Sequence, residues 1–296
     1  MKQVSFIVLN YNDMYTTKKL VDALVLWKRD AFNFNIVIVD NMSKDNSFEF
    51  LLNEYKNIAD VDVIRSERNG GYSYGNNYGM IYAINKYNPD YIAIANPDIE
   101  VEHSTFVELV KSFSESSDIA VVAPAMKDIN GNYSIRSQKL PTLRDDVRLC
   151  FNSSSNRTFK SNNDCVNNKK NFIITEMVPG SFFVVKTDYF KKVGLFDDGV
   201  FLFCEERILG KKMKDCGYKI VLRSDLFFVH AHSVSIKKAY DILSTWKLIM
   251  KSRCYYQKKY NRSNFAQLWL LKICSFIFVI CLDIKLKLYN MLNRKK

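Results

Sequence analysis

The stretch YIAIANPDIEV (residues 91–101) is an apolar run that stops on an Asn-Pro-Asp triplet. The run 91–95 has the length and the continuous hydrophobicity of a β-strand that is buried on both faces. Pro97 fixes its own φ angle and has no backbone N–H, so the chain must leave the sheet there. Asp98 therefore lies just beyond a buried strand, where it can cap a turn or face a ligand.

Two earlier apolar runs end in the same way. The run 5–9 is followed by Asn10 and Asn12, and the run 36–39 is followed by Asp40. Helical periodicity occupies residues 16–27 and 47–55 between these runs. Alternation of strands and helices predicts an α/β fold with a mostly parallel central sheet flanked by helices. Ligands bind outside the carboxyl ends of such strands, so the three polar strand ends indicate one shared site.

The same alternation continues along the chain. A glycine-rich stretch, RNGGYSYGNNYG (residues 68–79), follows the third strand and precedes a predicted helix. We expect further strands at 61–64, 119–123, 182–185 and 219–222, and helices at 80–85, 105–113, 188–193 and 206–215. Residues 151–171 are rich in Asn and Ser and are expected to form a surface excursion.

Two side-chain pairs in the second half of the chain can carry chemistry. Glu205 and Glu206 follow the aromatic stretch FLFC at the start of a predicted helix, where acidic residues suit the helix dipole and where one could act as a general base. His230 and His232 follow the last predicted strand at alternate positions. They are structural histidines or, for one of them, a metal ligand.

Composition bounds the class of protein. The chain has 296 residues, a formal charge of +12 and seven cysteines without a CxxC pair, which favours a reducing cytosol over a disulfide framework. The N-terminus enters a strand at once and shows no signal-peptide pattern. Charge alone admits nucleic acid as a partner, but no nucleic-acid motif is present, and we expect none to bind.

The amino-acid composition changes at about residue 240, and we predict a boundary there between a catalytic domain (1–239) and a helical extension (240–296). The extension is basic and aromatic, and its segment 265–282 is strongly apolar. The run is 18 residues long with Gln267 and Lys272 inside it, slightly short for a spanning helix. A basic amphipathic helix on an anionic membrane surface is the favoured interpretation, with a spanning helix and a helix packed on the domain as alternatives.

Seven segments together resemble the family 2 glycosyltransferases of GT-A fold, in the bacterial rhamnosyltransferase-like branch. They occur in the family's order over residues 4–236: SFIVLNYND, IVIVDNMSKDNS, RNGGYSYGNNYGM, IAIANPDIEV, VPGSFFVVK, FLFCEERILGKKMKDCGYKI and VHAHSVS. The resemblance implies an inverting, metal-dependent transferase. Its donor would be dTDP-rhamnose or a UDP-sugar. Its acceptor would be a glycan, carried on a polyprenyl diphosphate, in the synthesis of a cell-wall or capsular polysaccharide.

The resemblance also implies roles for single residues. Asn10, Asn12 and Asp40 would line the nucleotide pocket, with Asp40 pairing with the base, and Gly70 and Gly71 would let the backbone pass close to the nucleotide.

The remaining implied roles concern the metal and the reaction. Asn96 to Asp98 would be the DxD-type motif, with Asp98 holding Mn²⁺ or Mg²⁺ against the diphosphate. His230 would complete the metal site, with His232 as the alternative. Glu206 would be the catalytic base, with Glu205 beside it.

Two positions depart from the family pattern. Asn96 replaces the first acid of the DxD motif, which leaves Asp98 as its one carboxylate. Ile208 stands where a second acid is usual after the glutamate pair, which leaves open whether Glu205 or Glu206 is the base. A non-catalytic, transferase-like partner at the membrane is therefore the alternative function.

Other enzyme classes are disfavoured. A nucleotidyl pyrophosphorylase or a dehydrogenase would need a glycine-rich loop after the first strand, where this chain has LNYND. We expect a cytoplasmic protein, peripheral on the inner face of the cell membrane, and an oligomer is compatible with this organisation.

Overall fold

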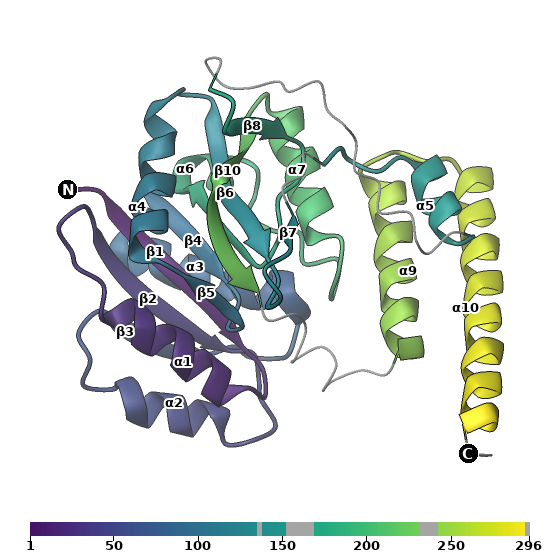
Figure 1. Cartoon of the computed structure of the whole chain (residues 1–296), viewed down its shortest axis with the longest axis horizontal. Helices are drawn as coiled ribbons and strands as arrows, with labels where there is room; N and C mark the ends of the chain where they lie inside the picture. The colour runs from purple at the N-terminus through teal and green to yellow at the C-terminus, as the bar shows by residue number, and fades with distance from the viewer. Residues whose placement is uncertain (135–137, 152–168, 231–241, 294–296) are drawn as a thin grey trace.

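The structure, a computed structural model, describes residues 1–134, 138–151, 169–230 and 242–293. Its centre is a single ten-stranded sheet, in which eight strands follow the order β3-β2-β1-β4-β9-β6-β10-β5 while β7 pairs with β6 and β8 with β10. Helices cover both faces of the sheet, and two further helices, α9 and α10, stand beside it (Figure 1). The prediction of an α/β fold is confirmed.

The N-terminal half of the sheet is parallel. Strands β1, β2, β3 and β4 pair in register, so that the last residues of β1 and β2, Asn10 and Asp40, lie opposite each other. This half comprises β1 (Gln3–Asn10), α1 (Met14–Val25), β2 (Asn33–Asp40), α2 (Ser47–Tyr55), β3 (Val61–Arg65), α3 (Gly71–Tyr87) and β4 (Tyr91–Ala95).

Beyond β4 the sheet is mixed, which the sequence pattern did not predict. Strand β9 lies between β4 and β6 and is antiparallel to both, while β10 is parallel to β6. This half comprises β5 (Ile99–Val101), α4 (His103–Lys111), a 3₁₀ turn (Ser112–Ser114), β6 (Ile119–Lys127), β7 (Tyr133–Ser134), α5 (Leu143–Leu149), β8 (Phe172–Thr175), β9 (Phe182–Lys186), α6 (Thr187–Lys192), α7 (Glu205–Asp215) and β10 (Lys219–His230).

The two faces of the sheet bury separate hydrophobic clusters. Along β1, Phe6 points to the face covered by α1, α2 and α4, and its neighbour Ile7 points to the face covered by α3, α6 and α7. Both side chains are fully buried. This period of two is why the strand reads as a continuous apolar run.

Helix α3 begins at Gly71 and includes most of the glycine-rich stretch, which the sequence analysis had placed ahead of the helix. Gly75 and Gly79 lie one turn apart and face the sheet, where a Cβ would overlap Leu9 at the first position and Val39 at the second. Because neither glycine has a side chain, the helix can lie close to β1 and β2. This tertiary contact offsets the poor helix propensity of glycine, about 1 kcal/mol per residue.

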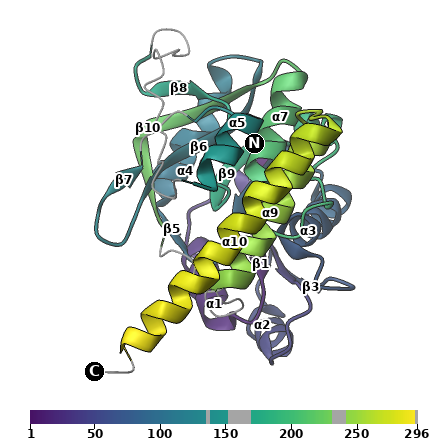
Figure 2. The same cartoon turned by 90° about the vertical axis from the view of Figure 1, so that its right-hand side faces the viewer.

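The C-terminal helices are α9 (Ile242–Lys259) and α10 (Phe265–Asn293). They run side by side with α5 at one end, and α10 is the outermost element (Figures 1 and 2). The 23-residue stretch Phe265–Lys287 is long and apolar enough to cross a membrane, as judged by length and composition, and most of it is exposed. The predicted boundary at residues 239/240 falls within 231–241, outside the described residues.

Candidate active site

Strands β5 and β10 bring the predicted metal ligands together. They pair antiparallel, with His230 opposite Ile99, and Asp98 immediately precedes Ile99. Nε2 of His230 lies 3.2 Å from Oδ1 of Asp98, and the side chains are 14% and 9% exposed. Two residues separated by more than a hundred positions thus form one partly buried pair at the end of the sheet.

This pair suits a divalent cation. Two neighbouring ligands of an octahedral ion with bonds of about 2.1 Å lie about 3 Å apart, close to the observed separation. A carboxylate oxygen with an imidazole nitrogen is a donor set that Mn²⁺ accepts, whereas Mg²⁺ prefers oxygen. In the part of the chain that the structure describes, no third His, Cys, Asp or Glu joins the pair. Substrate phosphates and water are ligands that could complete the coordination. His232 lies outside the described residues.

The predicted catalytic carboxylates stand at the first turn of α7. The two residues before them, Phe203 and Cys204, both have a φ of about +70°, which is strained for residues with a side chain. Such strain costs about 1–3 kcal/mol per residue and is characteristic of functional sites. The turn buries Glu205, which is 6% exposed, and leaves Glu206 partly exposed.

Burial controls the ionisation of this pair. Burial, together with the neighbouring charge of Glu206, raises the pKa of Glu205 to about 8. Burial also raises the pKa of Glu206. Backbone hydrogen bonds at Glu205 and Phe203 favour the ionised form but do not offset burial, and among the described residues Oε1 of Glu205 has no hydrogen-bond partner. One carboxyl group of the pair therefore holds a proton at neutral pH while the other can ionise.

A pocket of about 290 Å³ joins the metal pair to the glutamates. His230, Asn96, Glu205 and Glu206 all line it. Asn96 is held there because its N–H donates to the carbonyl of Ser181 over 2.8 Å. Predicted residues from three separate segments, Asn96, the two glutamates and His230, therefore border a single pocket.

Tyr72 and Gly180 also line this pocket, although the sequence analysis gave neither a role. The hydroxyl of Tyr72 donates to the carbonyl of Gly180 over 2.5 Å. A Cβ at Gly180 would lie 3.1 Å from Oε1 of Glu206, so glycine leaves room for that carboxylate. The VPGS segment was part of the resemblance, and its glycine could have been read as such a close approach.

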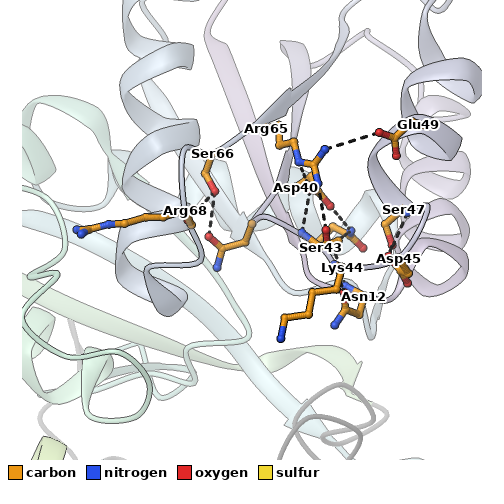
Figure 3. A network of polar contacts seen from close by, with 12 residues as sticks. Asn12, Asp40, Ser43, Lys44, Asp45, Ser47, Glu49, Arg65, Ser66 and Arg68 are labelled. Atoms are coloured by element: carbon orange, nitrogen blue, oxygen red, sulfur yellow. Dashed lines mark hydrogen bonds and ion pairs between the residues drawn. The ribbon is translucent and has the colours of Figure 1, made fainter.

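The predicted nucleotide residues form a compact network at the ends of β1 and β2 (Figure 3). Asp40 is fully buried, and its carboxylate accepts hydrogen bonds from Asn10 over 3.0 Å and from the backbone of Ser43 over 3.1 Å. Arg65 adds an ion pair at 3.4 Å. Asn12, in a left-handed conformation, accepts from the backbone N–H of Lys44 over 2.8 Å.

This network gives Asp40 a structural task that the sequence did not reveal. The carboxylate fixes the loop after β2, and in this arrangement it is not exposed to a ligand. Pairing of Asp40 with a base stays a prediction.

The glycine pair after β3 lets the chain pack closely against the loop before α7. Gly71 has a φ of +86°, and a Cβ there would overlap the carbonyl of Phe201. The next N–H, that of Tyr72, donates to the same carbonyl over 3.0 Å. Gly70 precedes the helix and would meet the ring of Tyr74 if it carried a Cβ. The close approach is thus to the chain's own loop before α7, and an approach to a nucleotide stays a prediction.

Asn41 is a further residue that the sequence analysis missed. Its buried side chain donates to the carbonyl of Gly71 over 3.2 Å and to Asn69 over 3.1 Å, while its backbone N–H donates to Asn10. It therefore ties the end of β1 to the glycine turn. Its position directly after Asp40 was the available signal.

Comparison with known proteins gives consistent results. A family model described as Glycosyl transferase family 2 matches residues 5–193. The rhamnosyltransferase WbbL of Escherichia coli (strain K12) is 25% identical over 273 residues, which cover 88% of this chain and 97% of that protein. The low-salt glycan biosynthesis hexosyltransferase Agl10 of Haloferax volcanii is 24% identical over 203 residues, which cover 69% of this chain and 59% of that protein.

Among solved structures, the mannosyltransferase PcManGT from Pyrobaculum calidifontis, in complex with GDP-Man and Mn²⁺, superimposes with a TM-score of 0.60. The match covers 96% of this chain and 75% of that one, at 14% identity. At this identity the likeness concerns the fold alone.

Proposed function

The chain belongs to glycosyl transferase family 2 and is a glycosyltransferase, and we propose that it moves a rhamnosyl or hexosyl group from a nucleotide diphosphate to a lipid-linked glycan. The donor would be dTDP-rhamnose or a UDP-sugar. The product would enter a surface polysaccharide. The relatives named as a rhamnosyltransferase and a hexosyltransferase support the choice of sugar class.

One observation carries the proposal: a pocket of about 290 Å³ is lined by both His230 and Glu206. His230 is paired with Asp98, so an anion-neutralising site and a candidate base border the same space. Displacement at an anomeric carbon needs both, because the leaving diphosphate gains charge while the attacking hydroxyl loses a proton.

In the proposed reaction Glu206 accepts the proton of the acceptor hydroxyl. That oxygen bonds to the anomeric carbon as the bond from carbon to the diphosphate oxygen breaks, and the nucleoside diphosphate leaves with the electron pair. A single displacement inverts the anomeric centre. General-base assistance of this kind contributes about 10²–10⁴-fold.

Asp98 and His230 would hold the divalent cation, Mn²⁺ or Mg²⁺, which when bound neutralises charge on the diphosphate. Asn96 would position the donor beside this pair. Asn10, Asn12 and Asp40 would shape the nucleotide end.

The protonation of the glutamates supports the assignment of Glu206 as the base. Glu205 is more deeply buried and its pKa is raised to about 8, so at neutral pH it keeps its proton. A protonated neighbour lets Glu206 ionise without a second negative charge in the pocket. Glu206 also lies against Gly180, whose lack of a side chain leaves room for this carboxylate.

The location we propose is the cytoplasmic face of the membrane, with α10 resting on it. Exposed apolar side chains on this helix, among them Phe265, Trp269 and Phe276, support the contact. An acceptor carried on a lipid would then lie in the same surface.

The test is transfer or donor hydrolysis measured with a panel of UDP- and dTDP-sugars and Mn²⁺. We expect Glu206→Gln to lower kcat about 10²–10⁴-fold. Glu67→Gln, at an exposed glutamate outside the pocket, serves as the matched control and should keep full activity. Equal and negligible turnover of the wild type and Glu206→Gln would favour the non-catalytic partner instead.

A second measurement tests the metal site. We expect UDP or dTDP to raise the melting temperature of the wild type only when Mn²⁺ is present, and to have no effect on Asp98→Asn. Equal shifts in both proteins would remove Asp98 from the metal site.

A further inference from the structure

A second and larger cavity, of about 730 Å³, lies between the catalytic domain and the C-terminal helices. Its walls are the turn at residues 68–70, the loop at residues 198–201, and one face each of α9 and α10. We call it the basic pocket. None of its residues has a role in the reaction proposed above except Gly70.

Both helices turn a mixed face toward the basic pocket. On α9 the lining residues Leu248, Lys251, Tyr255 and Lys258 recur at intervals of three or four, which places them on one side of the helix. On α10 the same spacing relates the lining residues Phe265, Leu268, Trp269 and Lys272. Each face therefore offers aromatic or aliphatic surface together with ammonium groups.

The cations of the basic pocket are not neutralised by the protein. Arg68, Lys251, Lys258 and Lys272 line it, and among the described residues no carboxylate lies within ion-pair distance of any of them. Asp198 is the one acid in the wall. By contrast Lys259, on the neighbouring side of α9, pairs with Asp197 at 2.8 Å. Four positive charges against one negative charge make the cavity attractive to an anion.

The spread of these charges favours a diphosphate over a single phosphate. Lys251 and Lys258 are seven residues apart on one helix, or about 10 Å along its axis. A diphosphate offers two anionic groups to these spread ammonium groups, whereas one phosphate offers a single one.

The apolar part of the cavity favours a lipid tail. Phe201 lines the cavity from the catalytic domain, and Phe265 and Trp269, which are 83% and 60% exposed, line it from α10. Further along α10, Phe276 and Ile277 continue the exposed apolar surface. A ligand with an anionic head and a long apolar tail can therefore occupy the pocket and follow the helix into a membrane.

The basic pocket and the catalytic pocket share a thin wall. Phe201 lines the basic pocket, and the next residue, Leu202, lines the catalytic pocket. Tyr72 also lines the catalytic pocket, and its N–H donates to the carbonyl of Phe201 over 3.0 Å. Ser252 of α9 donates to the carbonyl of Leu202 over 2.7 Å. The two pockets therefore adjoin at the loop before α7, which carries Glu206 at its end.

We propose that the basic pocket binds the diphosphate head and the first part of the tail of a prenyl-diphosphate acceptor. This inference rests on the proposed transferase function, since it assigns the acceptor side of the same reaction. Lys251 and Lys258 of α9, together with Lys272 of α10, hold the diphosphate, and Trp269 packs against the prenyl chain.

The experiment is titration calorimetry with farnesyl diphosphate in the presence of EDTA, with farnesol and inorganic pyrophosphate as the separate halves of the ligand. We expect farnesyl diphosphate to bind the wild type more tightly than either half. The double variant Lys251→Ala/Lys272→Ala should bind it at least about tenfold more weakly, because two charge-assisted contacts are lost. The matched control is Lys247→Ala/Lys285→Ala, which removes one exposed lysine from each helix outside the pocket.

Several outcomes would overturn the inference. It is wrong if both double variants bind alike, if pyrophosphate binds as well as farnesyl diphosphate, or if UDP with Mn²⁺ displaces farnesyl diphosphate, which would locate the probe in the donor site. Displacement by vesicles of phosphatidylglycerol would instead show a general anionic-lipid surface.

Nucleotide binding separates this test from that of the proposed function. We expect the pocket variant to keep the Mn²⁺-dependent thermal shift with UDP or dTDP. If the wild type lacks that shift but binds farnesyl diphosphate in the pocket, the donor chemistry is refuted and the lipid site stands.

Discussion

Asp197 anchors the C-terminal helices to the catalytic domain, and its removal should measurably loosen them. Its carboxylate accepts hydrogen bonds from Lys259 over 2.8 Å, from Tyr260 over 2.5 Å and from Tyr255 over 3.0 Å, all near the end of α9. The backbone N–H of Gly199 adds another over 3.0 Å. Four donors converge on one side chain that is only 8% exposed.

The magnitude follows from the pKa of Asp197. Burial alone would raise it, but the hydrogen bonds from Lys259 and Tyr260 outweigh burial and lower it from 3.8 to about 2. Each pKa unit corresponds to about 1.36 kcal/mol, so the folded state favours the ionised carboxylate by about 2 kcal/mol. Asp197→Asn keeps the shape of the side chain and removes this charge. We expect it to lower the free energy of unfolding by about 2 kcal/mol at pH 7.

The pH dependence has a definite sign. Because the folded pKa of Asp197 lies below the unfolded one, its contribution is complete above about pH 4–5 and is lost as the pH falls toward 2. The difference in stability between wild type and Asp197→Asn should therefore be constant from pH 5 to pH 8 and should narrow in acid.

The assay is urea unfolding of both proteins at several pH values, with Asp198→Asn as the control. Asp198 is the adjacent residue and is exposed, so the control makes the same chemical change without removing the anchor. Equal stabilities of Asp197→Asn and Asp198→Asn at pH 7 would refute the reasoning, as would a difference that grows in acid.

Three further changes test the catalytic loop and its support. Gly71→Ala should cost about 3 kcal/mol in urea unfolding, because a Cβ at φ +86° meets the carbonyl of Phe201; unchanged stability would contradict this. Glu205→Gln should keep activity at pH 7 and remove a fall in kcat/KM that we expect above about pH 8, where ionised Glu205 would put a second charge beside Glu206; identical pH profiles would contradict it. Asp146→Asn should lower the free energy of unfolding by about 3–5 kcal/mol, because it removes the fully buried carboxylate that pairs with the guanidinium of Arg207 on α7; a loss below about 1 kcal/mol would show that this ion pair is not needed.

The strands of the fold were predictable because their signal is local. The run at 91–95 matches β4 to the residue, since a strand buried on both faces must be continuously apolar whatever its neighbours are. The direction of β9 was not predictable in this way. An antiparallel strand in the middle of the sheet has the same apolar pattern as a parallel one, and only its pairing with β4 and β6 distinguishes them.

Helix α3 shows the opposite failure. Four glycines between residues 70 and 79 disfavour a helix locally, by about 1 kcal/mol for each one inside it. The helix forms because Gly75 and Gly79 let it pack against β1 and β2. That contact depends on the residues of β1 and β2, which are distant in the sequence, so the local pattern of residues 70–79 could not predict the start of the helix.

By itself the sequence determined the alternation of strands and helices, the polar residues at the strand ends, and the motifs that identify the family. These features depend on residues that are close together in the sequence, so the pattern of apolar and polar residues shows them directly. Only the tertiary structure decided that His230 meets Asp98, that His230 and the glutamates line one pocket, and that Arg68 shares a cavity with lysines almost two hundred residues away. These contacts depend on how strands pair and helices dock. Both result from many weak interactions between distant segments, and no single segment has a sequence pattern that predicts them.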